Sequence, residues 1–254
     1  MKGVIMAGGK GTRLRPLTYH MPKPMVPLLH TPVMEYSIEL LKKHGITEIA
    51  VTTGYLGNDI KQYFGNGSSW GVELTYFDEI TPLGTAGSVK NAEAFLDETF
   101  VVISGDILTD FDLTDGIHFH ETKNSTLTIL MKQMNNPSEY GILTTNSEGK
   151  VNRFLEKPTC NEIFSDFINT GIYIVNPSIF SYIPQGECFD FSKDLFPLLL
   201  QKDGRVYGFV VSGYWSDIGT FPQYKQTRFD LLNDRVKFSV SRKTAGHHYR
   251  ISLK

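Results

Sequence analysis

Four strand-like segments recur through residues 1–103, three of them largely apolar and one, residues 72–77, alternating, and a stretch with helical spacing separates each from the next. Short runs that are apolar on both faces are typical of buried strands, whereas apolar residues spaced three and four apart are typical of helices. Their alternation favours βαβ units, and therefore a parallel sheet covered by helices. The predicted strands are residues 4–7, 48–53, 72–77 and 100–103, and the predicted helices between them are residues 34–44, 58–64 and 86–96.

The alternation stops after Asp112. The strand-like segments that follow have little helix between them, which predicts antiparallel or mixed additions to the sheet. No linker rich in Gly, Ser or Pro divides the chain, so we expect one mixed α/β domain over residues 1–235. We expect residues 236–254, which have no clear period, to form a basic tail that is disordered or is the remnant of a truncated C-terminal domain. The later predicted strands are residues 126–132, 140–145, 151–156 and 169–175, and the later predicted helices are residues 191–201 and 222–232.

Charge is distributed unevenly along the chain, although the formal net charge is only −2. Residues 1–34 carry five basic side chains and no acid, and residues 235–254 carry six basic side chains and no acid. The other 14 Lys and Arg side chains share residues 35–234 with all 27 Asp and Glu side chains. A basic block on an acidic body indicates a local anion site and argues against a nucleic-acid surface, which usually has a basic balance over a whole domain.

The composition excludes several other classes of protein. A hydrophobic content of 41% and a charged content of 20% argue against a disordered chain and against a coiled coil. No apolar run approaches the roughly 20 residues that a membrane helix needs, and the apolar stretch at the N-terminus is too short for a signal peptide. Two cysteines make no disulfide framework, so we expect a reducing, cytoplasmic location and no membrane partner.

A glycine-rich loop, residues 8–18, follows the first predicted strand. Glycines there let backbone N–H groups approach an anion closely. Arg13 and Arg15 in this loop, and Lys23 just after it, add positive charge. Together these features suit a polyphosphate, although a plain glycine-rich turn with solvated basic residues is the simpler alternative.

Two familiar phosphate-binding patterns do not fit this loop. A P-loop requires Ser or Thr directly after its lysine, but Lys10 is followed by Gly11. A dinucleotide fingerprint requires a third glycine, and Leu14 occupies that position. The sequence therefore gives little support to a P-loop ATPase or an NAD-binding protein.

Two aspartates follow features that could place them at a ligand. Asp106 comes just after the predicted strand 100–103, and ligands of open α/β sheets bind at the carboxyl ends of strands. Asp217 precedes a predicted helix. Mg²⁺ prefers oxygen ligands and usually takes one or two carboxylates plus substrate phosphates. Taken alone, each aspartate fits a helix or turn cap equally well, and Asp110 and Asp112 compete with Asp106.

These motifs together resemble the signature of the sugar-1-phosphate nucleotidylyltransferases, over most of residues 2–232. The resemblance implies a single Rossmann-like nucleotidyltransferase domain, with a mostly parallel central sheet flanked by helices and a smaller antiparallel or mixed sugar-binding part. Residues 82–87, Pro-Leu-Gly-Thr-Ala-Gly, are most similar to the mannose-1-phosphate guanylyltransferase branch. The matching segments are residues 7–18, 22–27, 85–87, 105–106, 156–158, 169–171 and 215–219.

The resemblance also implies roles for individual residues. Arg13 would hold the leaving phosphates, Lys23 would neutralise charge near the α-phosphate, and Lys157 would hold the sugar phosphate. Asp106 and Asp217 would hold Mg²⁺. The implied nucleotide-binding residues are Ala7, Gly8, Gly9, Gly11, Thr12, Arg13, Thr85, Ala86 and Gly87. The implied sugar-binding residues are Gly141, Glu156, Lys157, Asn169 and Thr170.

The reaction implied is nucleotidyl transfer from an NTP to a sugar 1-phosphate, giving an NDP-sugar and pyrophosphate. The preferred substrates are GTP and mannose 1-phosphate, giving GDP-mannose. The alternatives are a glucose-1-phosphate thymidylyl- or uridylyltransferase, and a regulatory subunit that binds nucleotide sugar without catalysis. Because all five charged site residues are present, the enzyme is favoured, and a homo-oligomer is left open.

Overall fold

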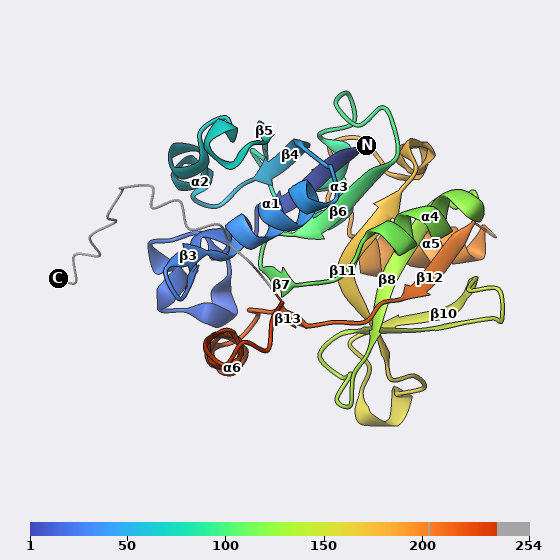
Figure 1. Ribbon diagram of the computed structural model, residues 1–254. Coiled ribbons are helices and arrows are strands. Elements are labelled where there is room, and N and C mark those ends of the chain that lie inside the picture. The colour runs from blue at the N-terminus through green and yellow to red at the C-terminus, as the bar shows by residue number, and fades with distance from the viewer. Residues whose placement is uncertain (203, 238–254) are drawn as a thin grey trace.

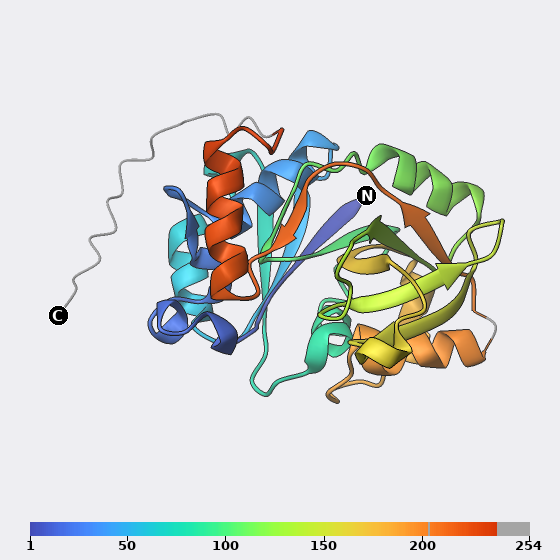
Figure 2. The ribbon, with the colours of Figure 1, turned by 90° about the horizontal axis from the view of Figure 1, so that it is seen from below.

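The structure is a computed structural model that describes residues 1–202 and 204–237. It contains a nine-stranded mixed sheet in which seven strands follow the order β10-β9-β11-β6-β1-β4-β5, while β8 pairs with both β11 and β12. The two halves of this sheet, one parallel and one mainly antiparallel, lie side by side in Figures 1 and 2. Of the predicted basic tail, residues 238–254 lie outside the described residues.

The first half contains the parallel strands β6 (Phe100–Ser104), β1 (Lys2–Ala7), β4 (Glu48–Thr53) and β5 (Glu73–Asp78). Alternate side chains of these strands enter two different cores, as expected for a sheet that is covered on both faces. One core packs against α1 (Val33–Lys43) and α2 (Gly57–Phe64), and the other packs against α3 (Gly84–Lys90). The prediction of βαβ units and a parallel sheet is confirmed.

The second half is built around β11 (Phe167–Val175), which runs antiparallel to its neighbours. Those neighbours are β6, β8 (Leu127–Gln133) and β9 (Gly141–Thr145), and β9 pairs in turn with β10 (Val151–Glu156). β12 (Val206–Val210) adds a parallel strand beside β8. Two helices, α4 (Thr114–Thr122) and α5 (Phe196–Gln201), pack on this half. The predicted antiparallel addition to the sheet is confirmed.

Two predicted helices differ in detail from the structure. The helix predicted over residues 86–96 ends at Lys90, and the chain then continues in single turns that are closed by backbone bonds three residues apart. The helix predicted over residues 191–201 begins with a wider π-turn, Phe191–Leu195. The Asp190 carboxylate accepts hydrogen bonds from the Ser192 and Lys193 amides and so fixes this wider start.

A small two-stranded sheet connects the C-terminal part of the described chain to the parallel half. β7 (Ile107–Thr109) pairs antiparallel with β13 (Trp215–Asp217), so that Ile107 lies opposite Asp217. α6 (Phe221–Leu232) follows and packs against the first loops, where Tyr224 donates a hydrogen bond to the Pro27 carbonyl at 2.9 Å. Pro27 belongs to β2 (Pro27–Leu28), which pairs with β3 (Thr31–Pro32). In the part of the chain that the structure describes, no helix has both the length and the apolar character needed to cross a bilayer.

Candidate active site

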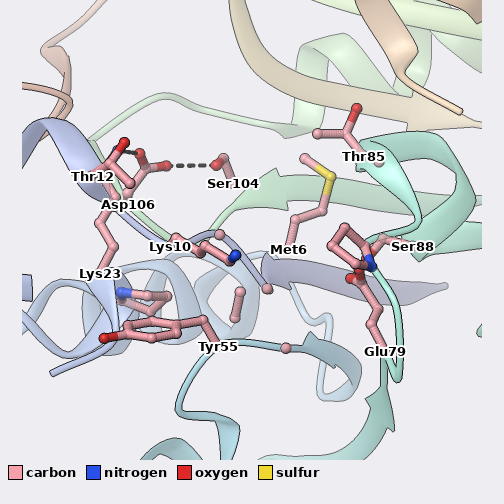
Figure 3. Close-up of a pocket in the computed structure, with 18 of the residues that line it drawn as sticks. Met6, Lys10, Thr12, Lys23, Tyr55, Glu79, Thr85, Ser88, Ser104 and Asp106 are labelled. Carbon is pink, nitrogen blue, oxygen red and sulfur yellow. Dashed lines mark hydrogen bonds and ion pairs between the residues drawn. The ribbon is translucent and has the colours of Figure 1, made fainter. Parts of the chain in front are cut away.

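A cavity of about 870 Å³ lies at the carboxyl ends of the parallel strands. The glycine-rich loop after β1, the residues after β4 and β5, and the end of β6 all contribute to its lining. Figure 3 shows two groups of side chains at opposite ends of this cavity, with Lys10 between them. One group includes Lys23 and Asp106, and the other includes Glu79 and Thr85. The carboxyl ends of parallel strands are where ligands of open α/β sheets bind.

The glycine-rich loop presents backbone to this cavity. Gly9 lines the cavity, and a Cβ added there would have no atom within 4 Å. Gly11 adopts a left-handed conformation with φ of 58°, which turns the chain into a short 3-10 helix, Thr12–Leu14. The Thr18 hydroxyl donates to the Gly11 carbonyl at 2.7 Å and holds this turn. The loop therefore leaves free backbone surface on which an anion could lie.

Lys23 and Asp106 form an ion pair at one end of the cavity. Each side chain is only 15% exposed, and the Ser104 hydroxyl donates to the second oxygen of Asp106 at 2.5 Å. Burial by itself would raise the pKa of Asp106, but the charge and hydrogen bond of Lys23 outweigh it, so that this pKa lies below its ordinary value. Asp106 is therefore held ionised, next to a cation that could face phosphate.

The β7–β13 pair brings Asp217 close to Asp106, although Asp106 and Gly219, and not Asp217, line the cavity itself. The Ile218 amide donates to the Asp106 carbonyl at 3.0 Å. Burial, and then the negative charge of Asp106, raise the pKa of Asp217. The Arg13 guanidinium is also close, because a Cβ added at Gly219 would lie 2.5 Å from Asp217 Oδ2 and 3.3 Å from Arg13 Nη2. Residues that are two hundred positions apart in the sequence thus converge on one point.

The two carboxylates fit a magnesium ion. Among the described residues, no group of three or more His, Cys, Asp or Glu side chains could hold a metal ion by itself. Mg²⁺, however, commonly binds through one or two carboxylates and completes its coordination with phosphate oxygens and water. Burial, and then the negative charge of Asp106, disfavour the ionised form of Asp217, and a divalent cation between the two carboxylates would relieve both effects.

The loop after β5 forms the other end of the cavity. Thr85 lines it, but Ala86 and Gly87 are not among the lining residues. Ala86 is completely buried, and a Cβ added at Gly87 would lie 2.7 Å from the Glu187 carbonyl oxygen. Of the three predicted nucleotide-binding residues here, only Thr85 lines the cavity, and the roles of Ala86 and Gly87 stay predictions.

Glu79 was not identified from the sequence, although it lines this end of the cavity. It accepts hydrogen bonds from the Ser88 hydroxyl at 2.6 Å and from the Leu83 amide at 3.1 Å. A Cβ added at Gly8 would lie 2.8 Å from Glu79 Oε1, so the first loop and this carboxylate are in contact. The position of Glu79 just after a predicted strand is the signal that could have identified it.

The predicted sugar-binding residues lie on the antiparallel half, and none of them lines the 870 Å³ cavity. Gly141 and Glu156 are register partners in β9 and β10, and a Cβ added at Gly141 would lie 2.6 Å from Glu156 Oε2. Lys157 follows at the strand end and is exposed. Asn169 donates to the Tyr173 hydroxyl at 3.0 Å. Burial, the largest influence, raises the pKa of Glu156.

Thr170 and Gly141 are the buried members of this predicted set, and Thr170 is 1% exposed. Its hydroxyl donates to the Leu130 carbonyl at 2.6 Å, and its carbonyl accepts from the Trp215 indole at 3.0 Å. The hydroxyl and carbonyl of Thr170 are therefore engaged within the protein, and its sugar-binding role stays a prediction.

Asp190 connects the two halves and was also missed from the sequence. It lines the cavity, accepts a hydrogen bond from the Thr85 hydroxyl at 2.9 Å, and accepts another from the Ser192 amide. Ser192 in turn lies 3.4 Å from the Asn169 amide nitrogen. An aspartate directly before the predicted helix 191–201 is an N-cap signal, but nothing local shows that the same side chain faces a cavity.

Comparison with known proteins places this geometry in a family. The family model described as nucleotidyl transferase matches residues 2–233. A UTP–glucose-1-phosphate uridylyltransferase of Synechocystis sp. is 40% identical over 251 residues, covering 93% of this chain and 65% of that protein. A mannose-1-phosphate guanylyltransferase of Mycobacterium tuberculosis is 34% identical over 231 residues, covering 90% of this chain and 64% of that protein. The chain thus spans less than two thirds of the length of these curated relatives.

A solved structure agrees with these matches. The crystal structure of a proposed glucose-1-phosphate thymidylyltransferase from Bacillus anthracis, in complex with sucrose, superposes with a TM-score of 0.84 at 27% identity. The superposition covers 94% of this chain and 98% of that chain. It supports the α/β fold described above, with its central sheet flanked by helices.

Proposed function

The chain belongs to the nucleotidyl transferase family, and from this premise we propose that it transfers a nucleotidyl group from a nucleoside triphosphate to a sugar 1-phosphate. The observation that carries the proposal is the convergence of two cations, Arg13 and Lys23, with two carboxylates, Asp106 and Asp217, beside the glycine-rich loop. We assign this activity to a catalytic domain formed by residues 1–235.

The proposed reaction is an in-line displacement at the α-phosphorus. A phosphate oxygen of the sugar 1-phosphate forms a bond to the α-phosphorus, the bond to the bridging oxygen of the β-phosphate breaks, and pyrophosphate leaves. No covalent intermediate with the protein is needed, so catalysis consists of positioning and charge stabilisation. In this scheme Lys23 neutralises charge at the α-phosphate and Arg13 holds the leaving phosphates.

The remaining groups position substrates in the same scheme. Asp106 and Asp217 would hold Mg²⁺, which when bound supplies positive charge to phosphate oxygens. Lys157 would contact the phosphate of the sugar 1-phosphate, and Glu156 and Asn169 would accept or donate hydrogen bonds at the sugar hydroxyls. The exposed position of Lys157 leaves its ammonium free to reach an incoming phosphate.

Two substrate pairs are supported by different observations. The 40% identity to a UTP–glucose-1-phosphate uridylyltransferase favours UTP with glucose 1-phosphate. The Glu79 carboxylate, an acceptor in the cavity, favours guanine, because N1–H and the N2 amino group of guanine can donate two hydrogen bonds whereas uracil donates one. The second argument supports GTP, and the 34% identity to a mannose-1-phosphate guanylyltransferase favours mannose 1-phosphate as its partner.

A matrix of substrates tests the proposal and separates the pairs. Pyrophosphate release is measured for four NTPs against glucose 1-phosphate and mannose 1-phosphate, with Mg²⁺ and with EDTA. We expect one pair to be turned over, and we expect Asp217→Ala to lower its rate well over tenfold while the fold survives by circular dichroism. If a folded protein releases no pyrophosphate with any pair, the regulatory-subunit alternative replaces the enzyme.

A further inference from the structure

The side chain of Gln223, on the first turn of α6, is aimed at Asp217 and not at solvent. Gln223 Nε2 lies 3.0 Å from Asp217 Oδ1 and 2.6 Å from the Tyr140 hydroxyl, and that hydroxyl lies 3.2 Å from the same Asp217 oxygen. We propose that Gln223 and Tyr140 form a positioning pair that fixes the orientation of the Asp217 carboxylate toward the metal. The inference rests on the proposed function, in which Asp217 is a metal ligand.

The orientation of the Gln223 amide is fixed by its own partners. The Thr220 hydroxyl donates to Gln223 Oε1 at 2.9 Å, so the amino group is the end that faces Asp217. The reversed amide would place an oxygen 3.0 Å from a carboxylate oxygen, with no hydrogen between them. Thr220 is also the N-cap of α6, so the start of the helix and the direction of this amide are set by one residue.

The chain leaves room for this arrangement at Gly219. A Cβ there would lie 2.5 Å from Asp217 Oδ2 and 3.2 Å from Gln223 Oε1. Any other residue would therefore displace the carboxylate or the amide. The hydrogen bonds to Asp217 converge on Oδ1, which leaves Oδ2 as the oxygen that faces Gly219 and Arg13.

Tyr140 approaches from the antiparallel half. It directly precedes Gly141 of β9, and its ring packs edge-on against Trp215 with ring centroids 5.3 Å apart. Its hydroxyl therefore links the predicted sugar-binding side to the predicted metal carboxylate. Partners behind a metal ligand typically change metal affinity or activity by 10–100-fold when they are removed, because the ligand loses its preset orientation.

The test compares five variants of the full chain with the unaltered protein, four single variants and the double variant that combines Gln223→Met with Tyr140→Phe. Gln223→Met keeps the length of the side chain and removes the amide, Tyr140→Phe removes the hydroxyl, and Asp217→Ala removes the carboxylate. The matched control is Gln226→Met, one turn further along α6, which removes a 2.9 Å bond from an exposed glutamine to Asp230. Binding of Mn²⁺ alone is followed by electron paramagnetic resonance, and the Mg²⁺ concentration that gives half-maximal pyrophosphate release is measured in parallel.

We expect Gln223→Met to weaken Mn²⁺ binding and to raise the half-maximal Mg²⁺ concentration about tenfold, with the rate recovering at high Mg²⁺. Tyr140→Phe should raise the half-maximal Mg²⁺ concentration about threefold. The double variant should raise it by less than the product of the two single changes, because the two side chains act as one unit. Gln226→Met should leave both quantities unchanged. A purely structural role would instead alter stability without a shift in metal dependence.

Two results would overturn the inference, and they are distinguishable. If Gln223→Met leaves both metal measurements within twofold while Asp217→Ala abolishes them, the positioning pair is wrong and the proposed function stands. If Asp217→Ala binds Mn²⁺ as the unaltered protein does, the metal assignment within the proposed function is wrong, and the inference is lost with it.

Discussion

Asp106 and Glu156 are carboxylates in the two halves of one sheet, and their surroundings shift their pKa values in opposite directions. Asp106, just past the end of β6, pairs with Lys23, and its pKa is lowered despite burial. Glu156, the last residue of β10, has a pKa that is raised, because burial outweighs the hydrogen bond from Ser192 and the charge of Lys157. Asp106 is therefore neutralised by a buried cation beside it, whereas the charge of Glu156 is neutralised only in part.

The two halves also differ in the chemical groups that they present to a ligand. The parallel half supplies backbone N–H groups and fixed cations, which suit phosphates of high charge. The antiparallel half supplies side-chain hydrogen-bonding groups such as Asn169 and Glu156, which suit neutral hydroxyls. The predictions below test whether the two halves can be perturbed separately.

The largest effect is expected at Lys23. Lys23→Ala should lower the turnover rate about 100-fold or more, because a preorganised cation at developing phosphate charge is typically worth that much. It should also lower Tm, since Asp106 loses its partner. Steady-state pyrophosphate release gives the rate. Lys61→Ala, which removes an ion pair with Asp78 on the surface of the same half, is the control and should stay within twofold.

A smaller and more selective effect is expected at Lys157. Lys157→Ala should raise KM for the sugar 1-phosphate about tenfold and leave KM for the NTP within twofold, because the exposed ammonium is predicted to contact only the sugar phosphate. Initial rates at varied concentrations of each substrate separate the two constants. Lys123→Ala, at the end of α4, is the control. An equal rise in both KM values would show that the halves do not bind substrates separately.

The parallel half could be predicted closely from its sequence. Its strands are short, mostly apolar on both faces except the alternating β5, and separated by helices of clear period, so local pattern and tertiary environment agree. The predicted strand 48–53 coincides with β4, and the glycine-rich loop lies at the end of β1 as expected. Asp106 is also where its position after a buried strand predicts, at the carboxyl end of the sheet.

The remaining site residues depend on contacts that sequence does not reveal. β7 and β13 are three residues each, too short to show a period, yet their pairing brings Asp217 beside Asp106. Ala86 and Gly87 follow Thr85 in a matching motif, but of the three only Thr85 lines the cavity. Contacts between distant segments, such as that of Gln223 with Tyr140, leave no local signal at either residue.

Removal of the hydrogen bond between Thr85 and Asp190, which links the two halves, is expected to have an intermediate effect on KM. Thr85→Val removes the hydroxyl that donates to Asp190 at 2.9 Å and accepts from the Phe191 amide at 2.9 Å. KM should rise about threefold for both substrates, because Asp190 also fixes the start of the helix that carries Ser192. Substrate kinetics measure this. Thr144→Val, which breaks an exposed bond to Asn152, is the control. A change in only one KM would contradict a shared link.

The smallest predicted effect is at Glu156, where a substitution should raise stability and not lower a function. Glu156→Gln should stabilise the protein at neutral pH, by about 2 °C in Tm, because the amide is buried at less cost than the carboxylate. The folded pKa is raised above its ordinary value near 4.5, so the contribution of Glu156 to stability is full below that value and is lost as pH rises through the folded pKa. The gain should therefore disappear near pH 4, where the carboxyl is protonated in both states.

Thermal unfolding of both proteins from pH 4 to pH 8 measures this dependence, and Glu162→Gln gives a control of opposite sign. Glu162 is exposed, and its pKa is lowered by its hydrogen bonds with Thr159 in a capping box, so its replacement should lower Tm as pH rises above the ordinary carboxyl range. If Glu156→Gln instead lowers Tm at pH 7, the Glu156 carboxylate is stabilised in place as Asp106 is. The ionised forms of Asp106 and Glu156 would then both be stabilised by their surroundings, and the contrast between the two halves would rest on their hydrogen-bonding groups alone.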